Sequence, residues 1–225
     1  NALHRIDMQQ ALMLMHEILP IVSAMRLPVV MGNANRAISG PLNIWNDHTD
    51  IMPQRDCGWI QMHAENGQEV IDMTIQSFRI AENPDVMLPT ILNMDGVQLT
   101  HMIEPLEFPS QEEVNRFLPD RVPYATLHPD RPLSRGCFNM PDIFTETMKA
   151  KDTALINAKK TIVKEFFKYN LWHNFPAFAA SRVNIFFYSA LANGGLPPPE
   201  SSHYILSQTK SQSDIRFRDA WPHKM

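Results

Sequence analysis

The chain has 225 residues, of which 44% are hydrophobic and 20% are charged, and its formal net charge is −4. This length suits one principal domain, and the slightly acidic balance offers no basic surface for nucleic acid. The most apolar region, 171–192, contains His173, Pro176 and Arg182, so no transmembrane segment and no membrane partner are predicted. Two cysteines and an N-terminus without a signal-peptide pattern favour a cytoplasmic location.

The first predicted elements are a helix and a strand. Between Gln9 and Met25 the apolar residues recur at three- and four-residue intervals, which is typical of an amphipathic helix. Pro20 is expected to bend this helix or to end it early. Residues 27–33, LPVVMGN, form a short apolar run of the kind found in a strand covered on both faces of a parallel sheet.

A second helix and strand follow. Asn66, with Glu69 three residues later, predicts a capped helix that stops at Asn83-Pro84. Residues 86–94 predict the next strand, in which Pro89 indicates a bulge or an edge position.

A proline-rich segment comes next. Seven prolines between 105 and 141 predict a segment that wraps around the outside of the domain. One helix interrupts it, starting at the capping box of Ser110.

The C-terminal part changes in character. Residues 142–168 contain neither Gly nor Pro and predict the longest helix of the chain. Residues 169–225 form an unassigned extension, which is expected to be largely irregular from 194 because Gly, Pro, Ser and Gln are enriched there. The predicted fold is therefore α/β, a mostly parallel sheet flanked by helices, with residues 1–141 as its main unit.

A dense cluster of polar side chains follows the first predicted strand, within NRAISGPLNIWNDHTDIMPQRDCGWIQ (35–61). Ligands of open α/β sheets bind beyond the carboxyl ends of the strands, which is where Arg36, Asp47, His48 and Asp50 are expected. An arginine there can hold a carboxylate or a phosphate through two parallel hydrogen bonds. The alternative is that Arg36 pairs with Asp47 or Asp50 and stiffens the loop.

His48 also has two interpretations. It can be an oriented acid, base or metal ligand, or a loop histidine that satisfies local backbone groups. One histidine and two acids at this spacing match no metal motif, so we predict no metal ligand, and we assign no catalytic residue.

The same stretch resembles the pyrimidine-domain region of the pyruvate:ferredoxin (flavodoxin) oxidoreductases. That family reads close to A-N-R-A-L-S-A-P-[IL]-N-I-W-N-D-H-S-D-x-M-x-x-R-D-T-G-W-I-Q. The similarity continues through LTHMIEPLE (99–107), HPDRPLSRG (128–136) and PDIF (141–144), and it extends over about residues 11–168.

The resemblance implies a partial thiamine-diphosphate-binding fold, and it implies an enzyme that decarboxylates pyruvate oxidatively to acetyl-CoA. Electrons would pass through iron–sulfur clusters to ferredoxin or flavodoxin, and coenzyme A would take the acyl group. The family's substrate-carboxylate arginine falls on Arg36. Asp47, His48 and Asp50 would shape the cofactor-facing loop, and Thr100 and His101 would border the same cleft or serve only in loop structure.

The resemblance also implies partners. Thiamine enzymes bind their cofactor between a pyrimidine-binding and a diphosphate-binding domain, and this sequence has no Gly-Asp-Gly motif for the diphosphate and magnesium. We therefore expect thiamine diphosphate to be shared with a partner chain that holds Mg²⁺, and iron–sulfur clusters to lie only on partner domains. Other oxidoreductase subunits are the expected partners, and the chain alone is expected to be inactive.

Both ends of the chain depart from the family pattern. The family's activating glutamate and a threonine near the substrate have no counterpart, and Asp7-Met8-Gln9-Gln10-Ala11 stands where the family has T-S-S-Q-G before its first helix. We therefore expect an N-terminally truncated or altered start. Two alternatives remain open: a non-catalytic interaction or structural module that retains the fold, or a related oxidoreductase for another 2-oxo acid.

Overall fold

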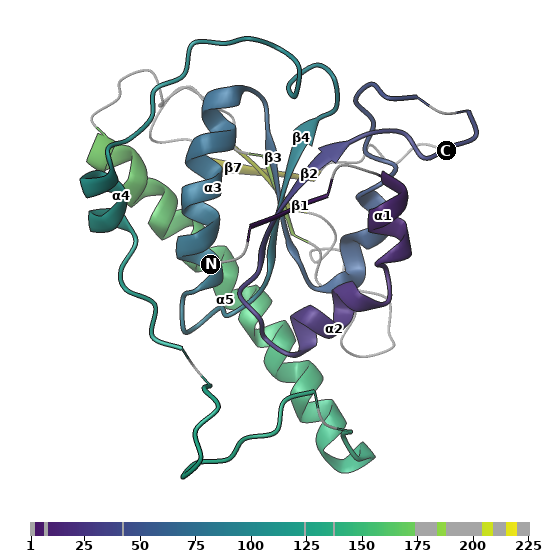
Figure 1. The fold of residues 1–225 in the computed structure, drawn as a ribbon, viewed down its shortest axis with the longest axis vertical. Coiled ribbons are helices and arrows are strands. Elements are labelled where there is room, and N and C mark those ends of the chain that lie inside the picture. The colour runs from purple at the N-terminus through teal and green to yellow at the C-terminus, as the bar shows by residue number, and fades with distance from the viewer. Residues whose placement is uncertain are drawn as a thin grey trace.

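The computed structural model describes the backbone of residues 3–6, 9–41, 43–123, 125–136, 138–173, 184–187, 204–208 and 215–219, and most side chains between 12 and 165. Figure 1 shows the arrangement of its elements. In chain order they are β1 (Leu3–Ile6), α1 (Gln9–Leu14), α2 (Ile18–Ala24), β2 (Val30–Asn35), the 3₁₀ helix η1 (Met52–Cys57), β3 (Ile60–Ala64), α3 (Gly67–Ala81), β4 (Thr90–Asp95), α4 (Gln111–Phe117), α5 (Pro141–His173), β5 (Asn184–Phe187), β6 (Tyr204–Gln208) and β7 (Ile215–Asp219).

The described strands form one sheet in the order β1-β2-β4-β3-β5-β6-β7. The neighbouring pairs from β1 to β3 are parallel, and β5, β6 and β7 are added antiparallel. The predicted fold class, an α/β sheet flanked by helices, is confirmed. In the parallel part all carboxyl ends lie at the same edge of the sheet.

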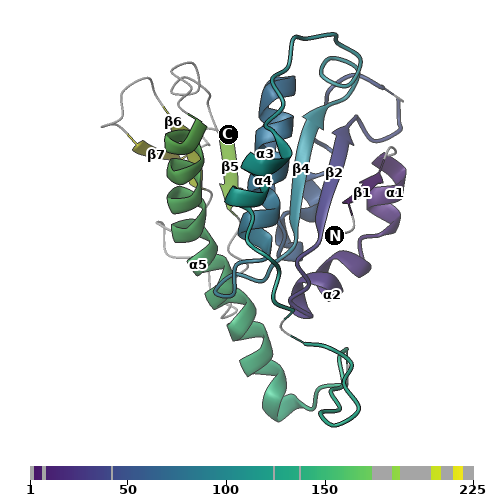
Figure 2. The same ribbon diagram turned by 60° about the vertical axis from the view of Figure 1, so that its left-hand side comes forward.

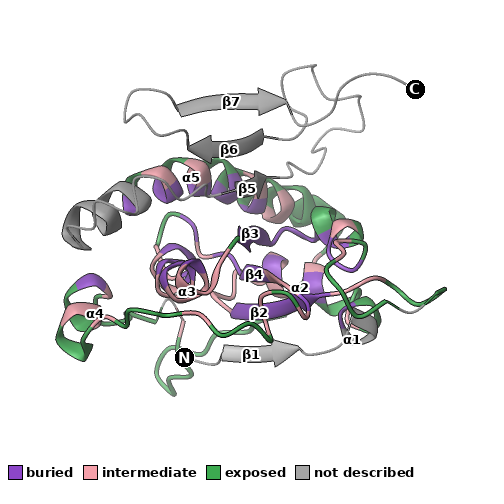
Figure 3. Ribbon diagram, turned by 90° about the horizontal axis from the view of Figure 1, so that it is seen from above, coloured by how far each residue is buried: buried purple, intermediate pink, exposed green. Residues whose placement is uncertain are grey.

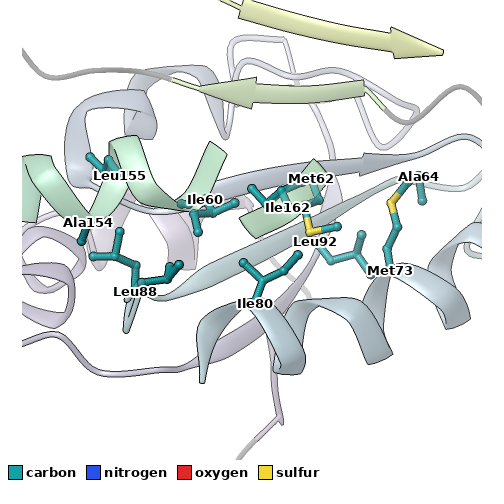
Figure 4. Packing of buried hydrophobic residues seen from close by; sticks show 12 residues of the cluster. Ile60, Met62, Ala64, Met73, Ile80, Leu88, Leu92, Ala154, Leu155 and Ile162 are labelled. Atoms are coloured by element: carbon teal, nitrogen blue, oxygen red, sulfur yellow. The ribbon is translucent and has the colours of Figure 1, made fainter. Parts of the chain in front are cut away.

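Helices cover both faces of the sheet (Figure 3). The face toward α3 and α5 carries the larger apolar cluster, drawn in Figure 4: Ile60, Met62, Ala64, Met73, Ile80, Val86, Leu88, Leu92, Ala154, Leu155, Ala158 and Ile162. The face toward α1, α2 and η1 carries the second cluster: Leu12, Leu19, Met31, Ile51, Cys57, Trp59 and Ile91. Burying these side chains supplies the main driving force for folding.

Two helix starts form as the sequence predicts. Asn66 caps α3 by accepting the backbone N–H of Glu69 at 2.9 Å. Ser110 and Glu113 form a reciprocal capping box at the start of α4. Both devices are local, because each satisfies N–H groups that the first helical turn leaves without partners.

The predicted N-terminal helix is divided into α1 and α2. The break lies at residues 15–17, before Pro20, which occupies the first turn of α2. The ring of a proline clashes with the carbonyl four residues earlier, but within a first turn it costs no hydrogen bond. The chain therefore ends one helix and begins another.

The strands differ from prediction in position and in number. The first predicted strand, 27–33, is found as β2 at 30–35, and the second, 86–94, is found as β4 at 90–95. Strand β3 was not predicted at all. Its sequence, IQMHA, is fully buried, yet Gln61 and His63 interrupt the apolar pattern that would have marked a buried strand.

The C-terminal part is described only in pieces. Helix α5 runs from Pro141 to His173, where the sequence predicts a helix over 142–168. From 194 the sequence predicts a largely irregular chain, but β6 and β7 lie there. Their apolar residues alternate with polar ones, as in Ile215-Arg216-Phe217-Arg218, which suits strands. Apart from β5, β6 and β7, residues 174–225 lie outside the described residues, as does Cys137.

The proline-rich segment leaves the body of the domain, as Figures 1 and 2 show. Between α4 and α5 it is largely exposed, and Val122, Leu127 and Phe138 stand in solvent. Within the described residues no helix is both long and apolar enough to span a membrane.

Two contacts join parts of the chain that are distant in sequence. Gly58 adopts φ 77°, in the left-handed region, between η1 and β3, and a Cβ there would lie 2.7 Å from Ser23 Oγ. Arg26 donates hydrogen bonds to three carbonyls, those of Val86 at 2.7 Å, Met87 at 3.1 Å and Ala150 at 3.2 Å. The arginine therefore ties the end of α2 to the loop before β4 and to α5.

Candidate functional site

A row of polar side chains crosses the sheet near its carboxyl edge. Asn33 of β2 is in register with Asn93 of β4, and Asn93 is in register with His63 of β3. All three side chains are buried. Because Met31 and Ile91 precede two of them by two residues and belong to the cluster beneath α1 and α2, the row lies on that same face.

Asp50 connects this row to the loop that follows β2. Its carboxylate is fully buried and accepts hydrogen bonds from Asn33 Nδ2 at 3.2 Å and Asn35 Nδ2 at 2.9 Å. Both amide nitrogens also lie near Asn93 Oδ1, at 3.1 and 3.2 Å. Asn93 in turn donates to the carbonyl of Met62 at 3.2 Å. Burial raises the pKa of Asp50, while the hydrogen bonds from Asn35 and Asn33 oppose that shift.

Arg36 follows β2 directly and is half-buried. Its Nε is buried and has no hydrogen-bond partner. Among the described residues no carboxylate lies within 4.0 Å of its guanidinium, so neither Asp47 nor Asp50 forms the ion pair that the sequence left open. Asp50 instead accepts the backbone N–H of Arg36 at 3.3 Å. The guanidinium therefore forms no ion pair with a described carboxylate, and its Nε–H has no acceptor.

Gly96, directly after β4, brings three segments together. Its N–H donates to the Asn35 carbonyl at 2.9 Å. A Cβ at this position would lie 2.2 Å from that same oxygen, 2.8 Å from Arg36 Cγ and 3.1 Å from the Ile44 carbonyl. Only a residue without a side chain allows the stem of Arg36 to lie across the end of β4 at this distance.

His48 lies at the same edge of the sheet. Its Nε2 is 3.8 Å from Asp95 Oδ1, at the end of β4, and its ring meets His63 edge-on with centroids 4.9 Å apart. Burial lowers the pKa of His63 to about 3, and the nearby His48 adds to that shift. His63 is therefore neutral at physiological pH.

The remaining predicted residues form local turns. Asp47 Oδ1 accepts the Thr49 N–H at 2.7 Å, and the hydrogen bonds from Thr49 lower the pKa of Asp47. Thr100 Oγ1 accepts the Val97 N–H at 3.0 Å and pairs with His101 Nδ1 at 2.8 Å. Thr100 and His101 thus follow the end of β4, while Asp50 lies buried behind the loop that carries Asp47 and His48.

Sequence reasoning missed the asparagines and the histidine on which the site is built. Asn33, Asn35, Asn93 and His63 all lie inside strands, where an apolar run or alternation and not a polar cluster is the usual sequence signal. The spacing of Asn33 and Asn35 carried a signal, because two residues apart in a strand share one face. A buried polar pair at a strand's carboxyl end indicates a site rather than a core.

The described residues include no group of three or more His, Cys, Asp or Glu side chains arranged to hold a metal ion. The oxygen and nitrogen groups gathered here are amides, one arginine, one imidazole on the rim and single carboxylates. Such a set suits an anionic organic ligand with hydrogen-bonding edges.

Comparison with known proteins decides the family. Residues 9–167 match the family model described as pyruvate flavodoxin/ferredoxin oxidoreductase, thiamine diphosphate-binding. The chain belongs to this family. The pyruvate synthase subunit PorA of Methanocaldococcus jannaschii is 51% identical over 154 residues, 68% of this chain and 40% of that protein. The PorA subunit of Thermotoga maritima is 45% identical over 159 residues, 69% of this chain and 41% of that protein.

A second kind of relative also matches this oxidoreductase-family chain. The ketoisovalerate oxidoreductase subunit VorA of Pyrococcus horikoshii is 40% identical over 154 residues, 68% of this chain and 39% of that protein. The chain spans about two fifths of the length of these relatives. The region matched by the family model, 9–167, contains Arg36, the buried polar row and α3 in full.

Proposed function

We propose that the chain is part of a pyruvate:ferredoxin oxidoreductase and lines the substrate side of its thiamine cleft. The complete enzyme would decarboxylate pyruvate oxidatively to acetyl-CoA and pass the electrons to ferredoxin or flavodoxin. The proposal is supported by the family of the chain and by its similarity to PorA subunits of pyruvate synthase.

The state of Arg36 is the observation that carries the proposal. A guanidinium with a buried Nε that lacks a partner leaves a strong donor unused, which costs about 1–3 kcal/mol unless something accepts from it. A small 2-oxo acid offers a carboxylate, the group whose two oxygens match the fork of an arginine. Arg36 would hold the substrate by this anionic end and so orient its oxo group.

The residues at this edge also fit one part of thiamine diphosphate. Asn35 Oδ1 is buried and accepts no hydrogen bond, so it is an acceptor available to an amino-substituted ring. When bound, this cofactor supplies the electron sink for decarboxylation. We assign the magnesium–diphosphate end to a partner chain, because the sequence has no Gly-Asp-Gly motif for it.

The other predicted residues take supporting roles. His48, Thr100 and His101 would line the cleft, with Asp47 holding the turn beside His48. Other oxidoreductase subunits would complete the site, carry the iron–sulfur clusters and bind coenzyme A and the electron acceptor. The chain alone would not turn over pyruvate.

The test replaces Arg36 in the assembled enzyme. Arg36→Lys keeps the charge but removes the fork, so the KM for pyruvate should rise at least tenfold, measured as pyruvate-dependent reduction of a viologen dye. Arg116→Lys, on the exposed part of α4, is the matched control and should leave the KM unchanged. An unchanged KM in Arg36→Lys would refute the role of Arg36.

The similarity to VorA supports a second candidate substrate, 2-oxoisovalerate. Both acids carry the carboxylate that Arg36 would bind, and they differ only in the branched tail. Profiling the assembled enzyme with pyruvate and 2-oxoisovalerate decides between them through the ratio of kcat/KM. A preference for the branched acid would replace pyruvate as the substrate.

The absence of turnover with every 2-oxo acid tested would favour the non-catalytic alternative. A thermal-shift assay of the assembled complex with thiamine diphosphate adds a reading that does not depend on turnover. A structural module predicts no shift in melting temperature, because it would not bind the cofactor.

A further inference from the structure

The carboxylate of Asp50 is hydrogen-bonded to residues at the carboxyl end of β2 and directly after it. Its side chain is fully buried, and three donors within four consecutive residues converge on it. Its Oδ1 accepts from Asn35 Nδ2 at 2.9 Å, and its Oδ2 accepts from Asn33 Nδ2 at 3.2 Å and from the Arg36 backbone N–H at 3.3 Å. A charged acceptor makes each of these bonds stronger than a neutral one would.

The contact to Arg36 is made through its backbone and not through its guanidinium. Asp50 therefore fixes the backbone of Arg36 at the point where the chain leaves β2, and it does so without occupying the hydrogen-bond donors of the Arg36 guanidinium. On the other side, the Arg36 side chain passes so close to Gly96 that a Cβ built there would lie only 2.8 Å from Arg36 Cγ. Arg36 is thus held between a buried carboxylate and the end of β4.

We propose that Asp50 is a positioning residue for Arg36, fixing the direction in which the guanidinium meets the carboxylate of a small 2-oxo acid. The inference rests on the proposed function of Arg36. It assigns to Asp50 a role in substrate affinity although Asp50 itself is closed off from the cleft. Small errors in the direction of a binding group are costly, because a bidentate contact tolerates little misalignment.

The test compares Asp50→Asn with Asp56→Asn. Asp56 lies in the same segment, in η1, but its side chain is exposed and its ion pair with Arg55 spans 3.9 Å. Asp50→Asn removes the negative charge of residue 50 and replaces one of its two acceptor oxygens with an amide nitrogen. The three donors of Asn33, Asn35 and Arg36 then share a single, neutral acceptor oxygen. Asp56→Asn removes the same charge from the surface.

Two measurements separate the positioning of Arg36 by Asp50 from the role of Arg36 in binding pyruvate. Hydrogen exchange of the Arg36 backbone amide, followed by NMR in the 225-residue chain, should speed up about tenfold or more in Asp50→Asn and stay unchanged in Asp56→Asn. In the assembled enzyme, Asp50→Asn should raise the KM for pyruvate about tenfold with kcat nearly unchanged. A general loss of structure would instead lower kcat and speed exchange throughout the sheet.

Each outcome decides something. Unchanged exchange at Arg36 in a folded Asp50→Asn variant overturns the proposal, and so does an unchanged KM where Arg36→Lys raises it. If exchange of the Arg36 amide speeds up but neither Asp50→Asn nor Arg36→Lys changes the KM for pyruvate, then Asp50 positions Arg36 and the proposed role of Arg36 in binding the substrate is wrong. If Asp50→Asn does not fold, Asp50→Glu moves the carboxylate by one methylene, and an unchanged KM there overturns the proposal.

Discussion

Asn33 and Asn93 face each other across β2 and β4, with Asn33 Nδ2 3.1 Å from Asn93 Oδ1. Asn93 accepts from two amides and donates to the Met62 carbonyl, so it joins all three central strands. Asn93→Leu should lower the free energy of unfolding by about 2–4 kcal/mol, because it leaves the Met62 carbonyl without its partner. Urea denaturation measures this change.

The control for this prediction is Asn43→Ala. Asn43 makes one exposed hydrogen bond, to the Trp45 N–H at 3.1 Å, and its loss should change stability by less than about 0.5 kcal/mol. Equal losses in both variants would show that the buried row contributes nothing beyond an ordinary loop contact.

Gly96→Ala should destabilise the fold more than Gly32→Ala. At Gly96 a Cβ would lie 2.2 Å from a backbone oxygen, whereas at Gly32 it would lie 3.3 Å from Met94 Cε, the movable end of a side chain. We expect a loss of about 3 kcal/mol or more at Gly96 and about 1 kcal/mol or less at Gly32. Thermal and urea unfolding of both variants tests the ranking, and a reversed ranking would contradict it.

His63 should make the fold sensitive to acid. Burial lowers its pKa to about 3, below the 6.5 of an unfolded histidine. The folded state therefore binds its proton more weakly, so His63 contributes stability above pH 6.5 that is lost as the pH falls toward 3. Between pH 6.5 and pH 3 the free energy of unfolding should fall by about 3–4 kcal/mol because of His63, a figure that allows for partial relaxation of the protein around the charged ring.

The measurement is urea unfolding at several pH values from 4 to 7.5. His63→Gln should flatten the acid limb of the stability curve, whereas His128→Gln, at an exposed turn, should follow the unmodified chain. An acid limb of the same slope in His63→Gln would show that His63 is not protonated on unfolding.

Glu69 should act in the opposite direction. Burial raises its pKa to about 7, above the 4.5 of the free side chain, and its Oε1 is buried without a partner. The folded state therefore holds the proton more tightly, and stability falls as the pH rises from 4.5 through 7, by about 2 kcal/mol. Glu69→Gln should remove this fall and be the more stable protein at pH 8.

Glu112→Gln serves as the comparison for Glu69, since Glu112 lies on the exposed face of α4. In Glu112→Gln the free energy of unfolding should still fall between pH 4.5 and 7, because Glu69 is unchanged. If Glu69→Gln keeps the fall as well, the titrating group is another one.

Local signals in the sequence were sufficient for some elements and not for others. The caps at Asn66 and Ser110 were predictable because a cap and its partner lie within three residues. Strand β3 was not, because its buried polar residues meet groups from a distant segment: Gln61 donates to the Ile51 carbonyl at 3.5 Å, and the His63 ring meets the ring of His48. Hydrophobic periodicity has no means of recognising a strand whose inward side chains are polar.

The site shows the same division. The place of Arg36 directly after a strand was predictable from the apolar run before it, and its role in substrate binding stays a prediction. The network around Arg36 was not predictable, because Asn33 meets Asp50 and Asn93 across 17 and 60 residues of chain. Such pairings depend on strand order, β2 beside β4 and β4 beside β3, and no local pattern encodes that order.

The place of α5 in the chain has a consequence for folding during synthesis. Ala154, Leu155, Ala158 and Ile162 close the larger apolar cluster, and the Ala150 carbonyl is one of the three that Arg26 binds. The central strands leave the ribosome well before these residues. The apolar face of the sheet that α5 covers therefore stays exposed to solvent until the chain through residue 162 has emerged. A nascent chain stalled before that point would expose a surface of the kind that chaperones recognise.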